Sequence, residues 1–241
     1  MAFETSYQIE IRPGPLTGAE AKKYCEETRM VLSQVWATDS GNALMTALSK
    51  TKYWTSIEPY DGKHGTCNAW AYPVSERVRG RQFLSRITFT AGQVCKNEFA
   101  GLPNEYLHHE LVHALRQTSG KWTPIGLGKG MEQYKNWEEL YAVVVTNIYI
   151  SDESNTYKSK LRGEYAAPNG LEPEFSESLT FFRKNELMFP LLDQFCTSLR
   201  DYTTSLVRVK AQFNPIAAIY QDRKVAERMS NSTLSSGVGA R

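Results

Sequence analysis

The sequence predicts an α+β fold with one substantial core. Strand signals are concentrated between Tyr53 and Thr90, and helical patterns dominate from Leu102 onward. The chain has 241 residues, of which 41% are hydrophobic and 22% charged, as in ordinary globular proteins. We therefore expect a single domain over residues 1–228, with its core at about 83–150 and a helical C-terminal portion at about 171–228.

The N-terminal part of the chain predicts one short strand and two helices. Ile9 and Ile11 alternate with charged residues, which is typical of a strand, and a proline and glycine turn follows. Thr17 and Glu20 have the spacing of a capping box, and the apolar residues that follow have helical spacing as far as Trp36. The stretch 39–41 reads as a break, and a second short helix fits residues 43–48.

The central part predicts a strand followed by a well-delimited helix. Residues 83–91 alternate between apolar and polar, as a half-buried strand does. Pro103 and Gly120 bracket the segment NEYLHHELVHALRQTS, in the positions where proline begins a helix and glycine follows its end. One face of this helix is apolar, formed by Leu107, Leu111, Ala114 and Leu115.

The remaining segments are mainly helical in pattern. The apolar stretch 137–150 contains a run of valines that suits a strand as well as a helix. Further helices fit residues 174–184, 187–209 and 215–228. Residues 229–241 are small and polar, which predicts a disordered tail.

Charge and hydropathy exclude several classes of partner. A net charge of +2 gives no field that implies a nucleic acid or an anionic membrane. Arg77, Arg79, Arg81 and Arg86 cluster locally, and a solvated strand edge explains them better than a nucleic-acid patch. No run of 18 apolar residues exists, and the N-terminus lacks the pattern of a Sec signal peptide.

The cysteines and the glycine-rich loop point to no separate chemistry. Cys25, Cys67, Cys95 and Cys196 are scattered without a C-x-x-C pair, so we expect free thiols in a reducing compartment, although an even count also permits two disulfides. The loop 126–130 lacks the spacing of a phosphate-binding loop, and we interpret it as the rim of a site.

The strongest functional signal is the motif His109-Glu110-Leu111-Val112-His113. Histidines four residues apart project from the same side of a helix, where both imidazoles can bind one metal ion. Glu110 lies one residue round the helix and can contact a water molecule at the metal without being a ligand. Zn²⁺ suits such a site, because two imidazoles and a carboxylate leave a fourth position for water. The alternative is a pair of surface histidines. The neighbouring His108 points away from the pair, and we interpret it either as a supporting residue behind the metal ligands or as structural.

A third protein ligand must come from a carboxylate, since no histidine follows His113. Glu138 and Glu139 begin the next apolar segment. If that segment is a helix, Glu139 faces the histidine helix with Thr146, and Glu138 points about 100° away. We therefore expect Glu139 to be the ligand, with Glu138 as the open alternative. Asn136 and Glu139 could instead form a capping box that needs no metal.

The residues 83–150 resemble a known family. YLHHELVHALRQTSG together with WEELYAVVVTNIY is similar to the NleD-like bacterial effector zinc metallopeptidases, which are gluzincins. The resemblance implies a zincin-like fold, with Zn²⁺ bound by His109, His113 and Glu139 and with Glu110 as general base and acid. It also implies a protein made in a bacterial cytoplasm and delivered without a Sec signal into a target cell, where it cleaves proteins. The long helical C-terminal portion departs from the family.

The resemblance adds a candidate for the oxyanion. Tyr134 resembles the tyrosine before the glutamate ligand in the lethal-factor type of metallopeptidase, although the spacing differs. A solvent-facing loop tyrosine is the alternative, and Tyr141 is a weaker candidate. Substrates of such enzymes commonly bind along a strand edge, and we expect the strand 83–91 to provide it.

The sequence thus predicts a zinc endopeptidase acting on protein or peptide substrates, with a secretion apparatus or a chaperone as a further partner. Two other functions stay open. The zinc site could belong to an inactive interaction module, or the substrate could be the cross-links of peptidoglycan.

Overall fold

The computed structural model describes residues 3–4, 7–60, 62, 69–91, 101–127, 134–156, 182 and 188–236. Its strands are β1 (Phe3–Glu4), β2 (Ile9–Ile11), β3 (Trp54–Pro59), β4 (Ala69–Val78) and β5 (Arg81–Phe89). Its helices are α1 (Gly18–Trp36), α2 (Asp39–Ser49), α3 (Pro103–Thr118), α4 (Trp137–Ser151), α6 (Met188–Ser198), α7 (Arg200–Leu206) and α8 (Pro215–Ser236). The α+β class predicted from the sequence is confirmed.

The strands form one mixed sheet in the order β1-β2-β3-β5-β4. The neighbours β2, β3 and β5 run parallel, whereas β4 is antiparallel to β5. Two residues connect β4 to β5, and both have positive φ: 49° at Arg79 and 80° at Gly80. This is the backbone pattern of a type I′ turn, whose twist matches that of a hairpin. The hairpin makes β4 the edge of the sheet among the described strands.

The two faces of the sheet differ in chemistry. Ile57, Ile87 and Phe89 are buried on the helical side, as the alternation within 83–91 predicts. The other face carries an ion-pair ladder in which Glu58 contacts both Arg12 and Arg86 at 3.4 Å. Arg86 therefore belongs to a solvated sheet face.

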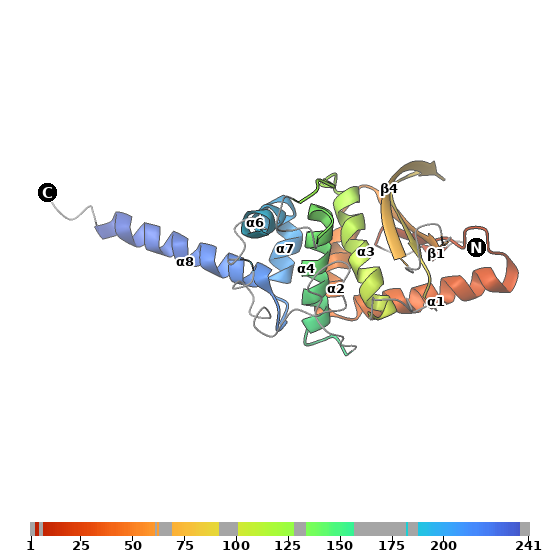
Figure 1. Cartoon of the computed structure of the whole chain (residues 1–241), viewed down its shortest axis with the longest axis horizontal. Helices are drawn as coiled ribbons and strands as arrows, with labels where there is room; N and C mark the ends of the chain where they lie inside the picture. The colour runs from red at the N-terminus through yellow and green to blue at the C-terminus, as the bar shows by residue number, and fades with distance from the viewer. Residues whose placement is uncertain are drawn as a thin grey trace.

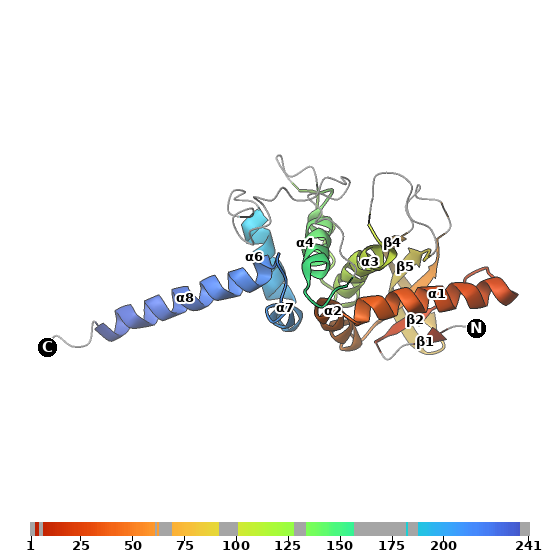
Figure 2. The same ribbon diagram turned by 90° about the horizontal axis from the view of Figure 1, so that it is seen from below.

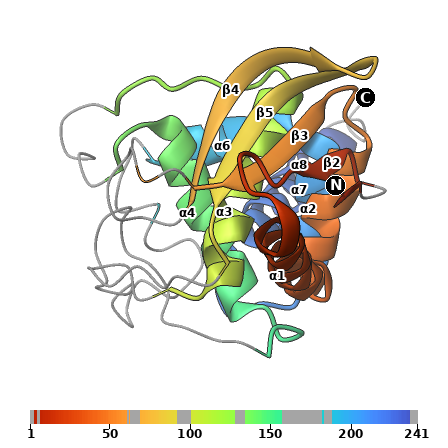
Figure 3. The ribbon, with the colours of Figure 1, turned by 90° about the vertical axis from the view of Figure 1, so that its right-hand side faces the viewer.

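Helix α3 lies at the centre of the molecule, between the sheet and α4 (Figures 1 and 3). Every residue from Asn104 to Thr118 is buried. Helices α6 and α7 lie on the far side of α4, and α8 extends away from them (Figure 2). The predicted site helix is therefore enclosed on all sides, and its polar residues need partners inside the protein.

The predicted break between the first two helices is present, but it lies at residues 37–38 and not at 39–41, which form the first turn of α2. The Thr38 side chain accepts a hydrogen bond of 3.0 Å from the Gly41 N–H and so caps the helix. A Cβ at Gly41 would lie 1.8 Å from the Val35 carbonyl oxygen, so this position requires glycine. The buried Asp152 carboxylate accepts further hydrogen bonds from the Ser40 N–H and hydroxyl.

In three other segments the structure either decides between helix and strand or changes the predicted bounds of a helix. The valine run is helical, within α4. The helix predicted over 187–209 is two helices, which Leu199 separates with non-helical angles of −126° and 48°. Helix α8 continues to Ser236, so the predicted tail begins later than residue 229. The helix predicted over 174–184 lies outside the described residues, except for Phe182.

Cys25 and Cys196 are buried free thiols, as expected, while Cys67 and Cys95 lie outside the described residues. Burial raises the pKa of Cys196 to about 12. In the described part of the chain, no helix combines the length and apolar character needed to cross a bilayer.

Candidate metal centre

Two consecutive turns of α3 bring His109 and His113 together. Their Nε2 atoms lie 3.2 Å apart, and the rings meet edge to face with centroids separated by 4.8 Å. Each histidine is 3% exposed. The i, i+4 spacing on a helix therefore produces the pairing that the motif predicts.

The first turn of α4 supplies the third group. Glu139 Oε2 lies 3.1 Å from His109 Nε2 and 3.2 Å from His113 Nε2. The Asn136 side chain accepts a hydrogen bond of 3.0 Å from the Glu139 N–H, so Asn136 is the N-cap of α4. Both interpretations of this pair therefore apply in part. Asn136 caps the helix, while the Glu139 carboxylate contacts the histidines.

The charges of the three groups are strongly coupled. Burial lowers the pKa of His113, but the contact with the Glu139 carboxylate outweighs burial and raises that pKa to about 9. Burial likewise disfavours the charged form of Glu139, yet His113 and His109 hold the pKa of this carboxyl well below its usual range. Without a metal ion, a proton shared among these atoms would hold them together.

The donor set fits a metal ion. In a tetrahedral site with Zn–N and Zn–O bonds of about 2.0–2.1 Å, neighbouring ligand atoms are about 3.3 Å apart. The separations of 3.1–3.2 Å between the three atoms are close to this value. His109, His113 and Glu139 form a candidate metal-binding triad in which each residue offers one ligand atom.

Glu110 lies beside the triad and faces the sheet. It is 7% exposed, and its Oε2 accepts a hydrogen bond of 2.7 Å from the Ala71 N–H in β4. Since this N–H is engaged with α3, the backbone of Ala71 faces away from β5. The Glu110 side chain therefore links α3 to the outer edge of β4.

The prediction that the strand 83–91 forms the open edge is wrong. Strand β5 pairs with β3 on one side and with β4 on the other, so it is interior. The edge beside α3 is β4. Pro73 lies two residues beyond Ala71 on the same outward-facing side, and it has no N–H to offer. The ladder is also irregular between Pro73 and Glu76.

Glu138, the open alternative for the third ligand, has other partners. Its carboxylate is fully buried and accepts hydrogen bonds from the Arg116 guanidinium and, at 2.7 Å, from the Thr123 N–H. The rotation of about 100° between adjacent helical residues separates Glu138 from Glu139, as expected.

The other residues singled out from the sequence are buried. His108 stacks on Tyr149 with ring centroids 4.3 Å apart, in agreement with a structural role. Tyr141 packs on Phe195 at 4.8 Å, within the core. Tyr134 is 2% exposed, so it is not the solvent-facing tyrosine of the alternative reading, and its role at the oxyanion stays a prediction.

Two residues near the site escaped the sequence reasoning. Trp122 meets the His113 ring edge to face at 5.4 Å, and Ala71 binds Glu110 through its backbone. The contact of Ala71 uses only its backbone N–H, so the residue type at this position does not predict it. The Trp122 contact depends on how the loop after α3 folds back, which spacing does not encode.

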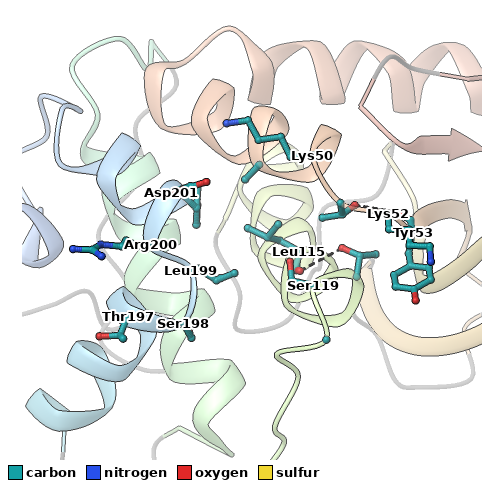
Figure 4. Close-up of a pocket in the computed structure, with 15 residues that line it drawn as sticks. Lys50, Lys52, Tyr53, Leu115, Ser119, Thr197, Ser198, Leu199, Arg200 and Asp201 are labelled. Carbon is teal, nitrogen blue, oxygen red and sulfur yellow. Dashed lines mark hydrogen bonds between the residues drawn. The ribbon is translucent and has the colours of Figure 1, made fainter.

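A separate hollow of about 540 Å³ lies at the C-terminal end of α3 (Figure 4). The ends of α2 and α3 and the junction of α6 and α7 line it. Lys50 and Arg200 point in different directions around it, so its charged groups do not converge on one point. None of the triad residues lines it.

Comparisons of the sequence with models of known protein families and with curated proteins find no match. The chemistry of the site therefore carries the functional argument.

Proposed function

We propose that this protein is a zinc-dependent endopeptidase with a zincin-like fold. The observation that carries the proposal is the arrangement of Glu110 beside the triad of His109, His113 and Glu139. A structural zinc site usually has four protein ligands, whereas three ligands with a neighbouring carboxylate are typical of a catalytic site.

The residues have distinct roles in this proposal. His109, His113 and Glu139 would hold the ion. Zn²⁺ would polarise the scissile carbonyl and lower the pKa of a water molecule to about 7. Glu110 takes a proton from the attacking water and passes it to the leaving amine. Tyr134 is the candidate donor to the oxyanion.

The substrate would be an extended protein or peptide segment that adds to the edge of β4. Backbone hydrogen bonds supply affinity in this mode, and side-chain pockets supply specificity. The bond from the Ala71 N–H to Glu110 supports this position, because it places the candidate base at that edge. Since this N–H is engaged and Pro73 has none, a substrate strand beside Glu110 would pair with the outward carbonyl groups of β4. The resemblance to NleD-like effectors supports proteins of a target cell as substrates, reached from a bacterial cytoplasm through a secretion apparatus or chaperone.

The test measures zinc content and hydrolysis in the wild type and in Glu110→Gln. We expect both proteins to retain a zinc ion, and Glu110→Gln to lose about 10²- to 10⁴-fold in the rate of casein cleavage. Release of fragments from purified cell wall, with casein left intact, would favour peptidoglycan cross-links as the substrate. Zinc binding with no hydrolysis of either would favour an interaction module, and a wild type that binds no zinc after reconstitution would overturn the proposal.

A further inference from the structure

We propose that Arg116 and Glu138 are a positioning pair that holds Glu139 at the metal, an inference that rests on the metal site of the proposed function. Arg116 lies on α3, three residues beyond His113. Glu138 lies on α4, next to Glu139. The pair therefore joins the same two helices as the triad, about one helical turn away.

The contacts of the pair are numerous and buried. Arg116 Nη2 donates to Glu138 Oε1 at 2.9 Å, and its Nε donates to the other carboxylate oxygen. Arg116 is 4% exposed and Glu138 is fully buried. This two-pronged geometry fixes the orientation of the carboxylate as well as its distance.

The pair fixes the rotation of α4 about its axis. Adjacent residues on a helix project about 100° apart, so anchoring the Glu138 side chain sets the direction of the Glu139 side chain. The Asn136 cap fixes where the helix begins by binding the Glu139 N–H. The Glu138 anchor restrains the same turn through the side chain next to the ligand.

The same pair also controls the loop after α3. Arg116 Nη2 donates to the Lys121 carbonyl at 2.6 Å, and Glu138 Oε1 accepts from the Thr123 N–H at 2.7 Å. These two bonds flank Trp122, whose ring lies against His113. The pair thus positions groups on both sides of the triad, namely the Glu139 carboxylate and the indole that packs on the His113 ring.

Stability alone does not call for this arrangement. Two charges must be desolvated to form it, and apolar residues of similar size commonly stabilise a buried contact equally well. The guanidinium lies over the face of Tyr141, with its central carbon 4.6 Å from the ring centroid, so an aromatic ring covers one side of the pair. An apolar pair could not form the hydrogen bonds that connect the Lys121 carbonyl and the Thr123 N–H to the first turn of α4.

The test measures the affinity for Zn²⁺ by competition with a chelator, and the visible absorption of the Co²⁺ form, which reports ligand geometry. We expect Glu138→Gln to bind Zn²⁺ about 10- to 100-fold more weakly and to change the Co²⁺ spectrum, which is the size of effect seen when groups that orient a metal ligand are lost. A double variant, Arg116→Met with Glu138→Leu, should keep the fold but retain the weakened affinity.

Asp152→Asn is the matched control. Asp152 is also a fully buried, hydrogen-bonded carboxylate, but it directly follows the last residue of α4, about 20 Å from Glu139, and its carboxylate binds Ser40 in the first turn of α2. This variant should lower the melting temperature and leave the Zn²⁺ affinity within about twofold of the wild type.

The outcomes separate this inference from the proposed function. Wild-type affinity and spectrum in folded Glu138→Gln would overturn the positioning role and leave the peptidase proposal intact. An equal loss of affinity in Asp152→Asn would also overturn it, since general destabilisation would then explain the loss. Zinc binding without hydrolysis would overturn the peptidase proposal alone, and a wild type that binds neither metal would overturn both.

Discussion

The Ala71 N–H in β4 donates a hydrogen bond of 2.7 Å to Glu110 Oε2, between the two histidines of α3. The contact joins residues 39 positions apart in the chain, and it fixes the carboxylate at the edge of β4, where we propose that a substrate strand binds. The length of the Glu110 side chain therefore matters as much as its charge.

Glu110→Asp tests the importance of that length. The shorter carboxylate keeps its charge but cannot hold the same bond to Ala71 while it faces the metal. We expect zinc to be retained and the rate of peptide hydrolysis to fall about 10²-fold or more, close to the effect of losing the general base. Zinc content and kcat on one peptide check this, and a rate near that of the wild type would contradict it.

The contact between His113 and Glu139 predicts a pH dependence in the metal-free protein. The folded-state pKa of His113 is raised to about 9, above its ordinary value of 6.5. Its contribution to stability is therefore fully present below about pH 6.5 and is lost as the pH rises through about 9. Melting temperatures in EDTA should fall over this interval. His113→Gln should flatten that part of the profile, and an unchanged slope in this variant would contradict the assignment.

Comparing two helix caps separates the effect of Asn136 on protein stability from its effect on Zn²⁺ binding. Asn136→Ala and Thr38→Ala each remove one side-chain cap, so each should destabilise the protein by about 1 kcal/mol in denaturant titrations. Only Asn136→Ala should also weaken Zn²⁺ binding, because Asn136 caps the turn that carries Glu139. Equal Zn²⁺ affinity in the two variants would show that the cap does not influence the ligand.

Trp122 should report metal binding by its fluorescence. Its ring lies 5.4 Å from that of His113, so bound Co²⁺ should quench its emission. Trp122→Phe should bind Co²⁺ but lose most of the quenching, although four other tryptophans remain. Quenching of the same size in this variant would show that another tryptophan lies closer to the ion.

The sequence was most informative where spacing along one helix decides the geometry. His109 and His113 meet because both lie on α3, and the direction of Glu139 followed once a helix was assumed for its segment. The valine run left that assumption open, because β-branched residues favour strands on propensity and the burial of α4 overrides this preference.

Prediction failed where distant segments pair. Strand β5 lies inside the sheet because β4 folds onto it through the turn at Arg79 and Gly80, and the strand pattern does not reveal which neighbour lies on either side. The partners of Glu138 were hidden for a related reason. Arg116 is 22 residues away in sequence, and only the packing of α3 on α4 brings the two together.

The edge of β4 also influences whether the protein associates with itself. An open strand edge that accepts a peptide would also accept the edge of a second copy of this chain, which is a route to aggregation. Pro73 removes one N–H from that edge, and the irregular stretch that follows shortens the regular ladder to a few residues. Because Glu110 also occupies the outward N–H of Ala71, these features together protect the isolated protein against edge-to-edge polymerisation.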